Sequence, residues 1–364
     1  MKFNYYMPVH MHFEQDAVKK YKEELLKIGT KALIVTGKHS SKKNGSLDDV
    51  IQVLNDVKIE YTIFDKVEEN PSLETIEKAA AIGLQNKVDF VIGIGGGSPM
   101  DASKAIAIFI KNPNINKDNV FSSGKLTHIP VVAVATTSGT GSEVTPYSIV
   151  TVNAQKTKKN LGQKVYPEIA FLDSKYTYDL PYNITVSTAV DAFTHLVEGY
   201  LNSNSTVMTD IYGEKGFELF AECFDNLIKK DLNKEFRDKV MFASALGGIQ
   251  ISQNGTSLPH GMGYPLTYFK GLPHGFANGV LTVEYLKTFK NTEKLNRMLS
   301  ILKLKDLSEL KQIFDKLFTV HIDVTEEEIV EYSKAIFSNK GKLKNHPEQL
   351  EYQEIENIYR NSFK

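Results

Sequence analysis

The sequence is poor in cysteine, because only Cys223 occurs among its 364 residues. A single cysteine excludes a disulfide within the chain and leaves thiolates out of any metal site of the chain. We interpret Cys223 as a packing residue. Metal ligands are therefore to be sought among histidines and carboxylates.

Long apolar runs are also absent, and none approaches the ~20 residues that a membrane span needs. The N-terminal residues MKFNYYMPVHMHF lack the basic, apolar and small-residue zones of a signal peptide. The net charge is −1 and the lysines are dispersed, which disfavours a nucleic-acid surface. We expect a cytoplasmic protein that binds neither membranes nor nucleic acid.

Arginine is scarce as well. Among 43 basic residues there are three arginines, all in the C-terminal part: Arg237, Arg297 and Arg360. Enzymes that bind carboxylate or phosphate substrates commonly use the rigid guanidinium fork. The scarcity therefore favours a neutral substrate.

The first half of the chain alternates between short β-rich runs and helical stretches, which predicts parallel strands covered by helices on both faces. The predicted strands are Lys31–Thr36, Glu60–Asp65, Val88–Ile94 and Ile129–Ala135, and the helical stretches include Ser46–Val57 and Ser72–Gln85. Ligands of such folds bind beyond the carboxyl ends of the strands, so the loops there matter most.

From about residue 181 long amphipathic stretches replace the β-rich runs, and they predict a helical second domain. These stretches are Ser205–Lys229, Lys234–Ser252, Glu293–Lys303, Asp306–Leu317 and Glu326–Phe337. We therefore predict two domains, a Rossmann-like α/β nucleotide-binding domain over 1–180 and an all-α metal-binding domain over 181–364. We expect the active site in the cleft between them.

Four residues of the second half indicate a divalent-metal site. Asp191 and His195 are four apart in the helical pattern of VDAFTHLVEGY, so both side chains leave one face. His260 and His274 bracket the glycine- and proline-rich segment HGMGYPLTYFKGLPH, which predicts that His274 returns on a loop. A structural role is the expectation for the other six histidines, namely His10, His12, His39, His128, His321 and His346.

Two loops of the first half suit a phosphate. Gly96 and Gly97 follow a predicted strand, and Ser98 is a predicted N-cap with Pro99 at the first helical position. Glycine amides and a positive helix end together favour an anion, although a tight turn also explains glycine there. After the strand at Ile129–Ala135, the segment TTSGTGSEVT brings hydroxyls, which by themselves are a weak signal.

The loop GKHSSKKNG lies where an adenosine ribose commonly binds in nucleotide folds. It carries Gly37, Ser40, Lys42 and Lys43 in place of an acidic residue that would hold a ribose 2′-hydroxyl. Small residues and lysines leave room and charge for a 2′-phosphate. We therefore expect NADP to be preferred over NAD, although an exposed lysine turn without a ligand has the same pattern.

Taken in order, these motifs resemble the iron-containing alcohol dehydrogenases, the group III family, which share a fold with dehydroquinate synthase. The resemblance runs from about Tyr6 to the C-terminus, and VTGKHSSKKNG, NPS at 70–72, GIGGGSPMDASK, TTSGTGSEVTPYS, VDAFTHLVEGYL and HGMGYPLTYFKGLPHG carry it. It is closest to NADP-type butanol and 1,3-propanediol dehydrogenases. It implies a homodimer, metal ligands at Asp191, His195, His260 and His274, and cofactor contacts at Gly96, Gly97, Ser98, Asp101, Thr137, Thr140, Asn70 and Lys159.

One position departs from the family pattern. Many members have a second histidine four residues after the first ligand of the HGM segment, where it is implicated in proton transfer; here the residue is Tyr264. A phenol titrates near ~10 and an imidazole near ~6.5, so tyrosine is the poorer relay at neutral pH. Tyr264 is left with hydrogen bonding or shaping of the pocket. Phe193 and Phe269 are further candidate pocket walls, with core packing as the alternative.

The expected reaction is metal-assisted hydride transfer between a primary alcohol or diol and NADP, which gives the aldehyde. Nitrogen and oxygen ligands suit Fe(II), and the general order of affinities favours Zn(II) over Fe(II); the resemblance implies iron. Two alternatives are an NAD-dependent alcohol or polyol dehydrogenase and a lyase of the dehydroquinate synthase type. The missing N-terminal arginines argue against the lyase. A non-catalytic nucleotide-binding protein would leave the ligand set without a purpose.

Overall fold

The computed structural model describes residues 2–318 and 322–363. It divides into two compact units, an α/β unit of Met7–Leu180 and a helical unit of Pro181–Lys364 with Met1–Tyr6. The first six residues, which we expected in the first domain, are thus grouped with the helices. There the Tyr6 main chain exchanges hydrogen bonds with the Gln253 side chain, and the Tyr5 hydroxyl lies 2.7 Å from that of Tyr212.

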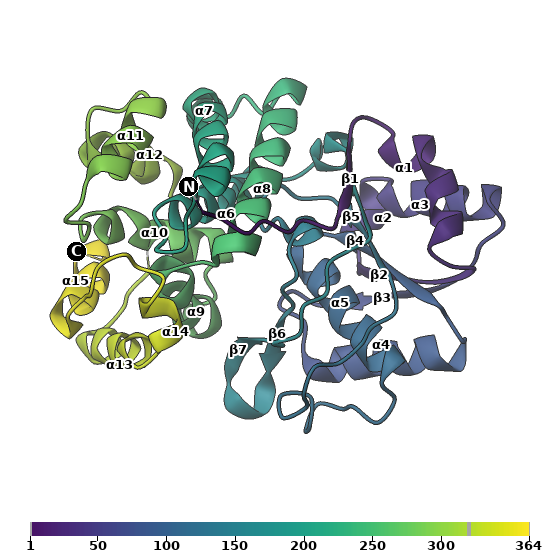
Figure 1. The fold of residues 1–364 in the computed structure, drawn as a ribbon. Helices are drawn as coiled ribbons and strands as arrows, with labels where there is room; N and C mark the ends of the chain where they lie inside the picture. The colour runs from purple at the N-terminus through teal and green to yellow at the C-terminus, as the bar shows by residue number, and fades with distance from the viewer. Residues whose placement is uncertain (1, 319–321, 364) are drawn as a thin grey trace. The chain divides into compact units, whose positions relative to one another are not determined.

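The α/β unit is built on a six-stranded parallel sheet in the order β1-β8-β5-β4-β2-β3 (Figure 1). Its strands are β1 (His10–Phe13), β2 (Lys31–Gly37), β3 (Glu60–Val67), β4 (Phe90–Gly95), β5 (Val131–Ala135) and β8 (Ile169–Leu172). The four predicted strands are confirmed, and the short strands β1 and β8 were not predicted. Two further strands, β6 (Ile149–Val152) and β7 (Thr157–Asn160), form an antiparallel hairpin.

Alternate residues of each strand supply two separate cores. Leu33 and Val35 of β2 face α4 (Leu73–Gln85) and α5 (Gly97–Lys111), whereas Ala32 and Ile34 belong with α1 (Ala17–Lys20) and α3 (Ser46–Asp56). This alternation follows from the period of two in a strand. The expected fold, a parallel sheet with helices on both faces, is confirmed. The short helical segments of this unit are η1 (Lys22–Lys27), α2 (Ser40–Lys43), η2 (Ser142–Val144), η3 (Asn153–Gln155) and η4 (Ser174–Thr177).

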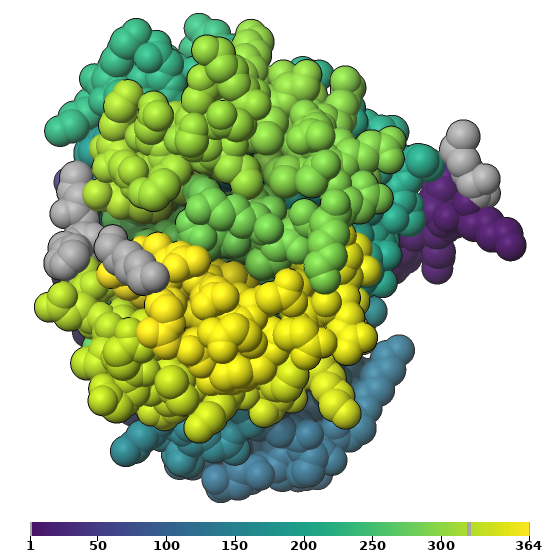
Figure 2. Space-filling model, turned by 90° about the vertical axis from the view of Figure 1, so that its left-hand side faces the viewer, coloured from purple at the N-terminus to yellow at the C-terminus, as the bar shows by residue number. Residues whose placement is uncertain are grey.

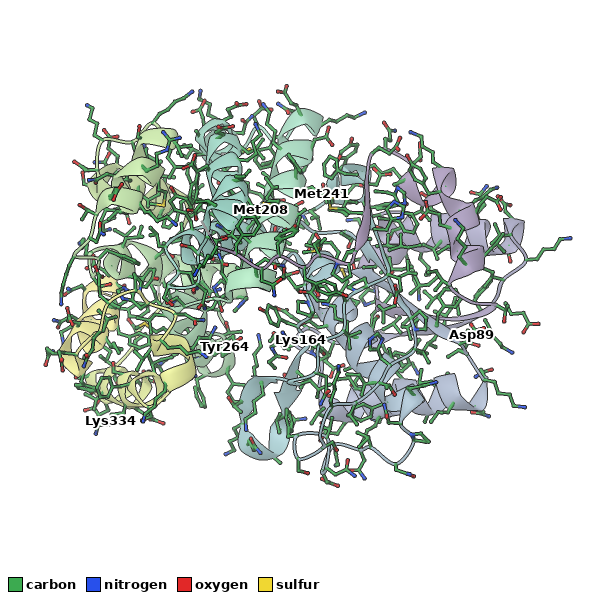
Figure 3. All side chains as sticks on the ribbon, in the orientation of Figure 1. Asp89, Lys164, Met208, Met241, Tyr264 and Lys334 are labelled. Carbon is green, nitrogen blue, oxygen red and sulfur yellow. The ribbon has the colours of Figure 1, made fainter. Side chains whose placement is uncertain are left out.

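Side-chain caps show why the long elements begin where they do. The Ser72 hydroxyl accepts from the backbone N–H of Thr75, so α4 begins at Leu73. The Asp89 carboxylate, labelled in Figure 3, accepts from the backbone N–H groups of Thr30 and Lys31 and so anchors the start of β2 next to β4. Parallel strands whose starts are aligned carry their carboxyl ends to one edge of the sheet.

The second unit is all helical in its described residues. Its helices are α6 (Tyr182–Tyr200), α7 (Val207–Lys229), α8 (Lys234–Asn254), α9 (Leu258–Lys270), α10 (His274–Leu286), α11 (Glu293–Ile301), α12 (Leu307–Leu317), α13 (Glu326–Phe337), α14 (Lys340–Leu343) and α15 (Tyr352–Ser362). Their apolar faces form one core around α6, and the light-green and yellow C-terminal segments cover the face of this unit in Figure 2. No helix in the described ranges has the length and apolar character needed to cross a membrane.

Candidate functional site

Helix α6 presents three acidic or imidazole side chains on one buried face. Asp191, His195 and Glu198 are spaced four and three residues apart, so they lie above one another along the helix. Asp191 is 3% exposed, His195 5% and Glu198 0%. A helix that carries three ionisable groups into a core must satisfy them there, because unpaired buried charge is very costly.

His260 reaches this face from α9, whose path differs from our expectation. The segment HGMGYPLTYFK, which we interpreted as a glycine- and proline-rich loop, is a helix that contains Pro265. A proline inside a helix removes one backbone hydrogen bond, and here it does not end the helix. The histidine is therefore held on a rigid element.

His274 is the first residue of α10, and only Gly271–Pro273 separate α9 from it. His274 thus returns over a loop as expected, but that loop has only three residues, and the rest of the segment is helical. The next residue explains the close approach of α10 to α6. A Cβ atom on Gly275 would lie 1.7 Å from the Ser187 carbonyl oxygen and 3.1 Å from Asp191 Cβ, so only glycine fits.

Three of the four predicted ligands meet in one cluster. The ligand atoms of Asp191, His195 and His260 all lie within 4.8 Å of one another. His260 Nε2 is 3.4 Å from Asp191 Oδ1, and the rings of His195 and His260 are 4.3 Å apart. His274 lies at the rim, with its Nε2 3.9 Å from Asp191 Oδ1.

Glu198 lies behind His260 and sets the orientation of its ring. The Nδ1 of His260 hydrogen-bonds to Glu198 Oε1, while Glu198 Oε2 accepts from the Ser257 backbone N–H at 2.6 Å. Within the described part of the chain, His260 Nε2 is buried without a hydrogen bond and faces Asp191. A metal-bound histidine usually gives its other ring N–H to a carboxylate in this way. The donor set therefore fits a divalent metal.

The pKa shifts of Asp191 and His260 indicate that the cluster favours a bound positive charge. Burial opposes ionisation of Asp191, but His195, His274 and His260 outweigh it and hold the pKa of the carboxyl well below its usual range. Burial lowers the pKa of His260, yet Glu198 and Asp191 together raise it to about 9. Two buried carboxylates thus draw positive charge to His260, and a divalent ion would supply that charge in place of the proton.

Asn278 is a further member of the site that sequence reasoning missed. Its Nδ2 atom donates to Asp191 Oδ1 at 3.2 Å and lies 3.2 Å from His274 Nε2. It follows His274 by one helical turn, as Glu198 follows His195. That spacing was the available signal for both residues.

The aromatic candidates divide among three environments. Tyr264, labelled in Figure 3, stacks on His274 with ring centroids 5.9 Å apart, so it belongs to the rim of the cluster. Phe193 is fully buried among the phenylalanines of α7 and α12, so of its two expected roles core packing holds and pocket wall does not. Phe269 is 56% exposed and stacks on Tyr332.

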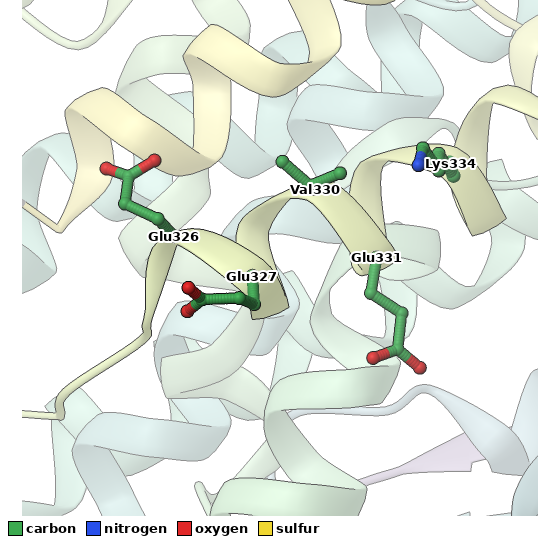
Figure 4. Close-up of a pocket in the computed structure, with 5 residues that line it drawn as sticks. All are labelled: Glu326, Glu327, Val330, Glu331 and Lys334. Carbon is green, nitrogen blue, oxygen red and sulfur yellow. The ribbon is translucent and has the colours of Figure 1, made fainter.

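A hollow on the helical unit lies elsewhere, along α13. Figure 4 shows the side chains that line it, which are Glu326, Glu327, Val330, Glu331 and Lys334. None of these residues belongs to the metal cluster. A mostly acidic, open helix face has no group suited to hydride chemistry, so we place the functional site at the buried cluster.

The α/β unit brings several predicted cofactor residues together after β4. A Cβ atom on Gly96 would lie 2.8 Å from Thr137 Oγ1, and one on Gly97 would lie 2.7 Å from Thr140 Cγ2. The glycines thus admit two threonine hydroxyls beside the start of α5. Unpaired backbone N–H groups at a helix start and adjacent hydroxyls fit a phosphate group.

The start of α5 differs in detail from the prediction. Gly96 is the N-cap and the helix begins at Gly97, so Ser98 is not the cap and Pro99 is the third helical residue. The Ser98 hydroxyl instead accepts from the backbone N–H of Asn70 at 3.1 Å. Two predicted cofactor residues are therefore in direct contact.

Asp101 is tied to the neighbouring loop by its own hydrogen bonds. Its carboxylate accepts from the Ser142 hydroxyl and from the Ile149 backbone N–H, the latter at 2.8 Å. Lys104, which sequence reasoning passed over, is fully buried and donates to the carbonyl oxygens of Ser142 and Tyr147. Burial lowers the pKa of Lys104 to about 8, against the pull of Asp101 and Glu143. Through these hydrogen bonds, Asp101 and Lys104 hold the segment that follows Thr137 and Thr140 in place.

The remaining cofactor candidates lie on exposed segments. Gly37 ends β2 beside Val67, and Ser40 and Lys43 lie on the short helix α2. Lys42 pairs with Asp65 of β3 at 2.6 Å, so a carboxylate lies beside this loop. Lys159 lies on β7, over the ring of Phe121 at 5.7 Å.

Comparison with known proteins adds independent evidence. Residues 8–174 match the family described as iron-containing alcohol dehydrogenase, and residues 185–363 match its C-terminal domain. The NADPH-dependent butanol dehydrogenase of Clostridium saccharobutylicum is 32% identical over 76% of this chain and 71% of its own. The NAD-dependent methanol dehydrogenase of Bacillus methanolicus is 29% identical over 76% and 73%.

A solved structure extends the likeness to the whole fold. An iron-containing alcohol dehydrogenase from Thermotoga maritima superposes with a TM-score of 0.92 at 39% identity, covering 100% of this chain and 99% of the other. The buried Asp191, His195 and His260 cluster could hold a metal ion, in agreement with the family that matches. The chain belongs to the iron-containing alcohol dehydrogenase family and is an oxidoreductase of alcohols.

Proposed function

We propose that the enzyme interconverts a small neutral primary alcohol or diol and its aldehyde, with iron as the metal and NADP(H) preferred over NAD(H). The observation that carries the proposal is the buried cluster of Asp191, His195 and His260 backed by Glu198. Nitrogen and oxygen donors without thiolate suit Fe(II). Butanal is the first substrate to test, because a relative acts on butanol.

A neutral substrate is supported by the positions of the three arginines. Arg237 is buried and donates to the Thr185 hydroxyl at 2.7 Å. Arg297 pairs with Glu214, and Arg360 pairs with Glu326 and Glu356. Each guanidinium is thus engaged by the protein, which leaves the bidentate groups that an acidic substrate favours already in use. The same observation disfavours a dehydroquinate synthase-like lyase.

In this proposal the residues of the helical unit hold the metal and control its surroundings. Asp191, His195 and His260 are the ligands, and His274 joins them from the rim. When bound, the ion would supply Lewis-acid chemistry and a nicotinamide would supply hydride chemistry. Glu198 keeps the proton of His260 on Nδ1, and Asn278 holds Asp191 and His274 in register.

Preference for NADP rests on the exposed segment after β2. Gly37 has no side chain to repel a 2′-phosphate, and Lys43 adds positive charge nearby. Asp65 offsets part of that charge through its pair with Lys42. One NADPH-dependent and one NAD-dependent relative are similarly distant, so the proposal is supported by the local residues alone.

The remaining cofactor contacts belong to the same proposal. Gly96, Gly97, Thr137 and Thr140 would hold the pyrophosphate, with Ser98 and Asn70 beside them. Lys159 is proposed as an outer contact from β7. We also propose a homodimer, which sedimentation equilibrium would test.

The decisive experiment is anaerobic butanal reduction by protein stripped with a chelator. Portions receive Fe(II), Zn(II) or no metal, each with NADPH and with NADH. We expect turnover only with metal, fastest with Fe(II) and NADPH. His260→Ala should lose both metal and turnover, whereas His128→Ala, outside the cluster, should retain both. Absence of turnover in every portion of metal-loaded protein would overturn the proposal.

A further inference from the structure

A second group of metal-type donors lies in the α/β unit, far along the chain from Asp191, His195 and His260. His10 and His12 lie on β1, and Glu24 lies on η1. Their ligand atoms all lie within 4.8 Å of one another. We had expected structural roles for both histidines, and nothing in the sequence pattern connects them with Glu24.

The strand itself brings the two imidazoles together. Residues two apart in a strand point to the same face, so His10 and His12 project side by side from β1. Their ring centroids are 4.3 Å apart. Glu24 approaches from η1, so that its Oε2 lies 3.0 Å from His10 Nδ1 and 3.2 Å from His12 Nε2.

These separations match the edges of a coordination sphere. With metal–ligand distances of ~2.0–2.1 Å, neighbouring ligand atoms lie roughly 2.9–3.4 Å apart in octahedral or tetrahedral geometry. Both observed nitrogen–oxygen distances fall in that range. The two imidazole nitrogens lie within 4.8 Å of each other, so an ion bound to all three groups would draw them closer together than this limit.

One histidine of the site is buried and the other is exposed to solvent. The ring of His12 is buried and stacks on Tyr21 at 3.8 Å and on Phe171 at 5.6 Å, which holds its plane. His10 is on the solvent side, with its side chain 61% exposed. Three protein donors with one open side are typical of a site that keeps water or a small ligand on the ion.

We propose that His10, His12 and Glu24 form an accessory binding site for a borderline divalent ion such as Zn²⁺, Ni²⁺ or Cu²⁺. Two imidazoles and one carboxylate suit these ions better than Mg²⁺ or Ca²⁺. A bound ion would fasten β1, which is an edge strand of the sheet, to η1. The site would therefore stabilise the edge of the α/β unit, independently of the metal cluster of the helical unit.

Metal stoichiometry tests the proposal and separates it from the catalytic site. After dialysis against Zn²⁺, the purified protein should hold about two ions per chain, and His10→Ala should hold about one. Asp191→Ala, which lacks a ligand of the other cluster, should also hold about one. His39→Ala changes an exposed histidine of the same unit and should leave about two.

Two further measurements exclude an indirect effect of unfolding. In the Asp191→Ala background, saturating Zn²⁺ should raise the melting temperature by on the order of 5 °C, and adding His10→Ala should remove the increase. His10→Ala alone should keep the alcohol dehydrogenase rate of the iron-loaded enzyme. Equal Zn²⁺ content in His10→Ala and the unaltered protein would overturn the proposal, as would an increase in melting temperature that persists without His10.

Discussion

Glu198 Oε1 accepts a hydrogen bond from His260 Nδ1, which leaves Nε2 of that ring directed at Asp191. The glutamate is therefore a positioning residue: it touches a proposed ligand and not the metal. Its second oxygen accepts from the Ser257 backbone N–H, so both carboxylate oxygens are used. No neutral side chain of the same shape offers two acceptors in these places.

We expect Glu198→Gln to weaken metal binding by about 10–100-fold. Glutamine accepts one of the two hydrogen bonds but directs an NH₂ group at the other donor, so the His260 ring loses its orientation or Ser257 loses its partner. Competition with a chelator of known affinity measures the change. Glu214→Gln, which alters a surface pair with Arg297, should leave the affinity unchanged. A Glu198→Gln protein with normal affinity would contradict the positioning role.

Gly275→Ala should separate α10 from α6. The new methyl group would meet the Ser187 carbonyl oxygen at 1.7 Å, a contact that no side-chain rotation relieves. We expect a loss of about 1–3 kcal/mol in stability, together with weaker metal binding as His274 moves outward. Chemical denaturation and a metal titration check the two effects. Gly124→Ala is the matched control, because its new methyl group would have no neighbour within 4 Å.

Gly37→Asp should move cofactor preference toward NAD. A Cβ atom at Gly37 would lie 3.5 Å from the Val67 carbonyl oxygen, an ordinary contact, so the fold should accept the change. The new carboxylate would repel a 2′-phosphate and bind a 2′-hydroxyl. We expect the ratio of kcat/KM with NADPH to that with NADH to fall by at least about tenfold. An unchanged ratio, or an equal fall in Gly124→Asp, would place the ribose elsewhere.

Tyr264→His tests whether this position carries protons. The new imidazole would lie one helical turn after His260, beside His274. If a relay can be restored, kcat near neutral pH should rise several-fold, roughly threefold or more. The pH dependence of kcat is the measurement, with Tyr268→His on the same helix as the control. An unchanged pH profile would assign Tyr264 to shaping the pocket.

Glu143 should make the stability of the metal-free protein depend on pH. Burial raises the pKa of its carboxyl from 4.5 to about 7, so the native state binds the proton more tightly than the unfolded state. The contribution of Glu143 to stability is therefore fully present below about pH 4.5 and is lost as pH rises through about 7, by up to about 3 kcal/mol. Glu143→Gln should flatten this dependence in denaturation midpoints measured between about pH 5 and pH 7.5.

The exposed Glu168 of the same unit gives the control, because Glu168→Gln should keep the dependence of the unaltered protein. A steep dependence that survives Glu143→Gln would point to another buried group. Lys104 contributes to the pH dependence of stability only above about pH 8. There the unfolded state binds the lysine proton more tightly than the native state, so stability rises with pH. The two residues therefore act in separate pH ranges.

Much of the architecture was predictable because it rests on periodicity. The four predicted strands β2, β3, β4 and β5 and the amphipathic helices α7, α12 and α13 have regular patterns. Strands β1 and β8 have four residues each, too few for a period to stand out. Helix α9 was missed because glycine and Pro265 usually mark loops, and here tertiary packing outweighs that local preference.

The proposed metal ligands were more predictable than the residues that hydrogen-bond to them. Asp191 and His195 share a helix face, and the histidines near glycine drew attention to α9 and α10. Glu198 and Asn278 looked like ordinary helix residues, because their roles depend on which helices meet them. His10 and His12 share a face of β1, but Glu24 joins them only through the placement of η1 beside that strand.

The hydrogen bonds of Tyr5 and Tyr6 attach the N-terminal residues to the helical unit. Residues before Met7 and after Leu180 belong to one unit, so the α/β unit is an insertion whose two ends are both attached to its host. Trimming the first six residues would thus remove contacts from the helices and leave the sheet complete. In a circularly permuted gene, the helical unit would become one continuous stretch of sequence.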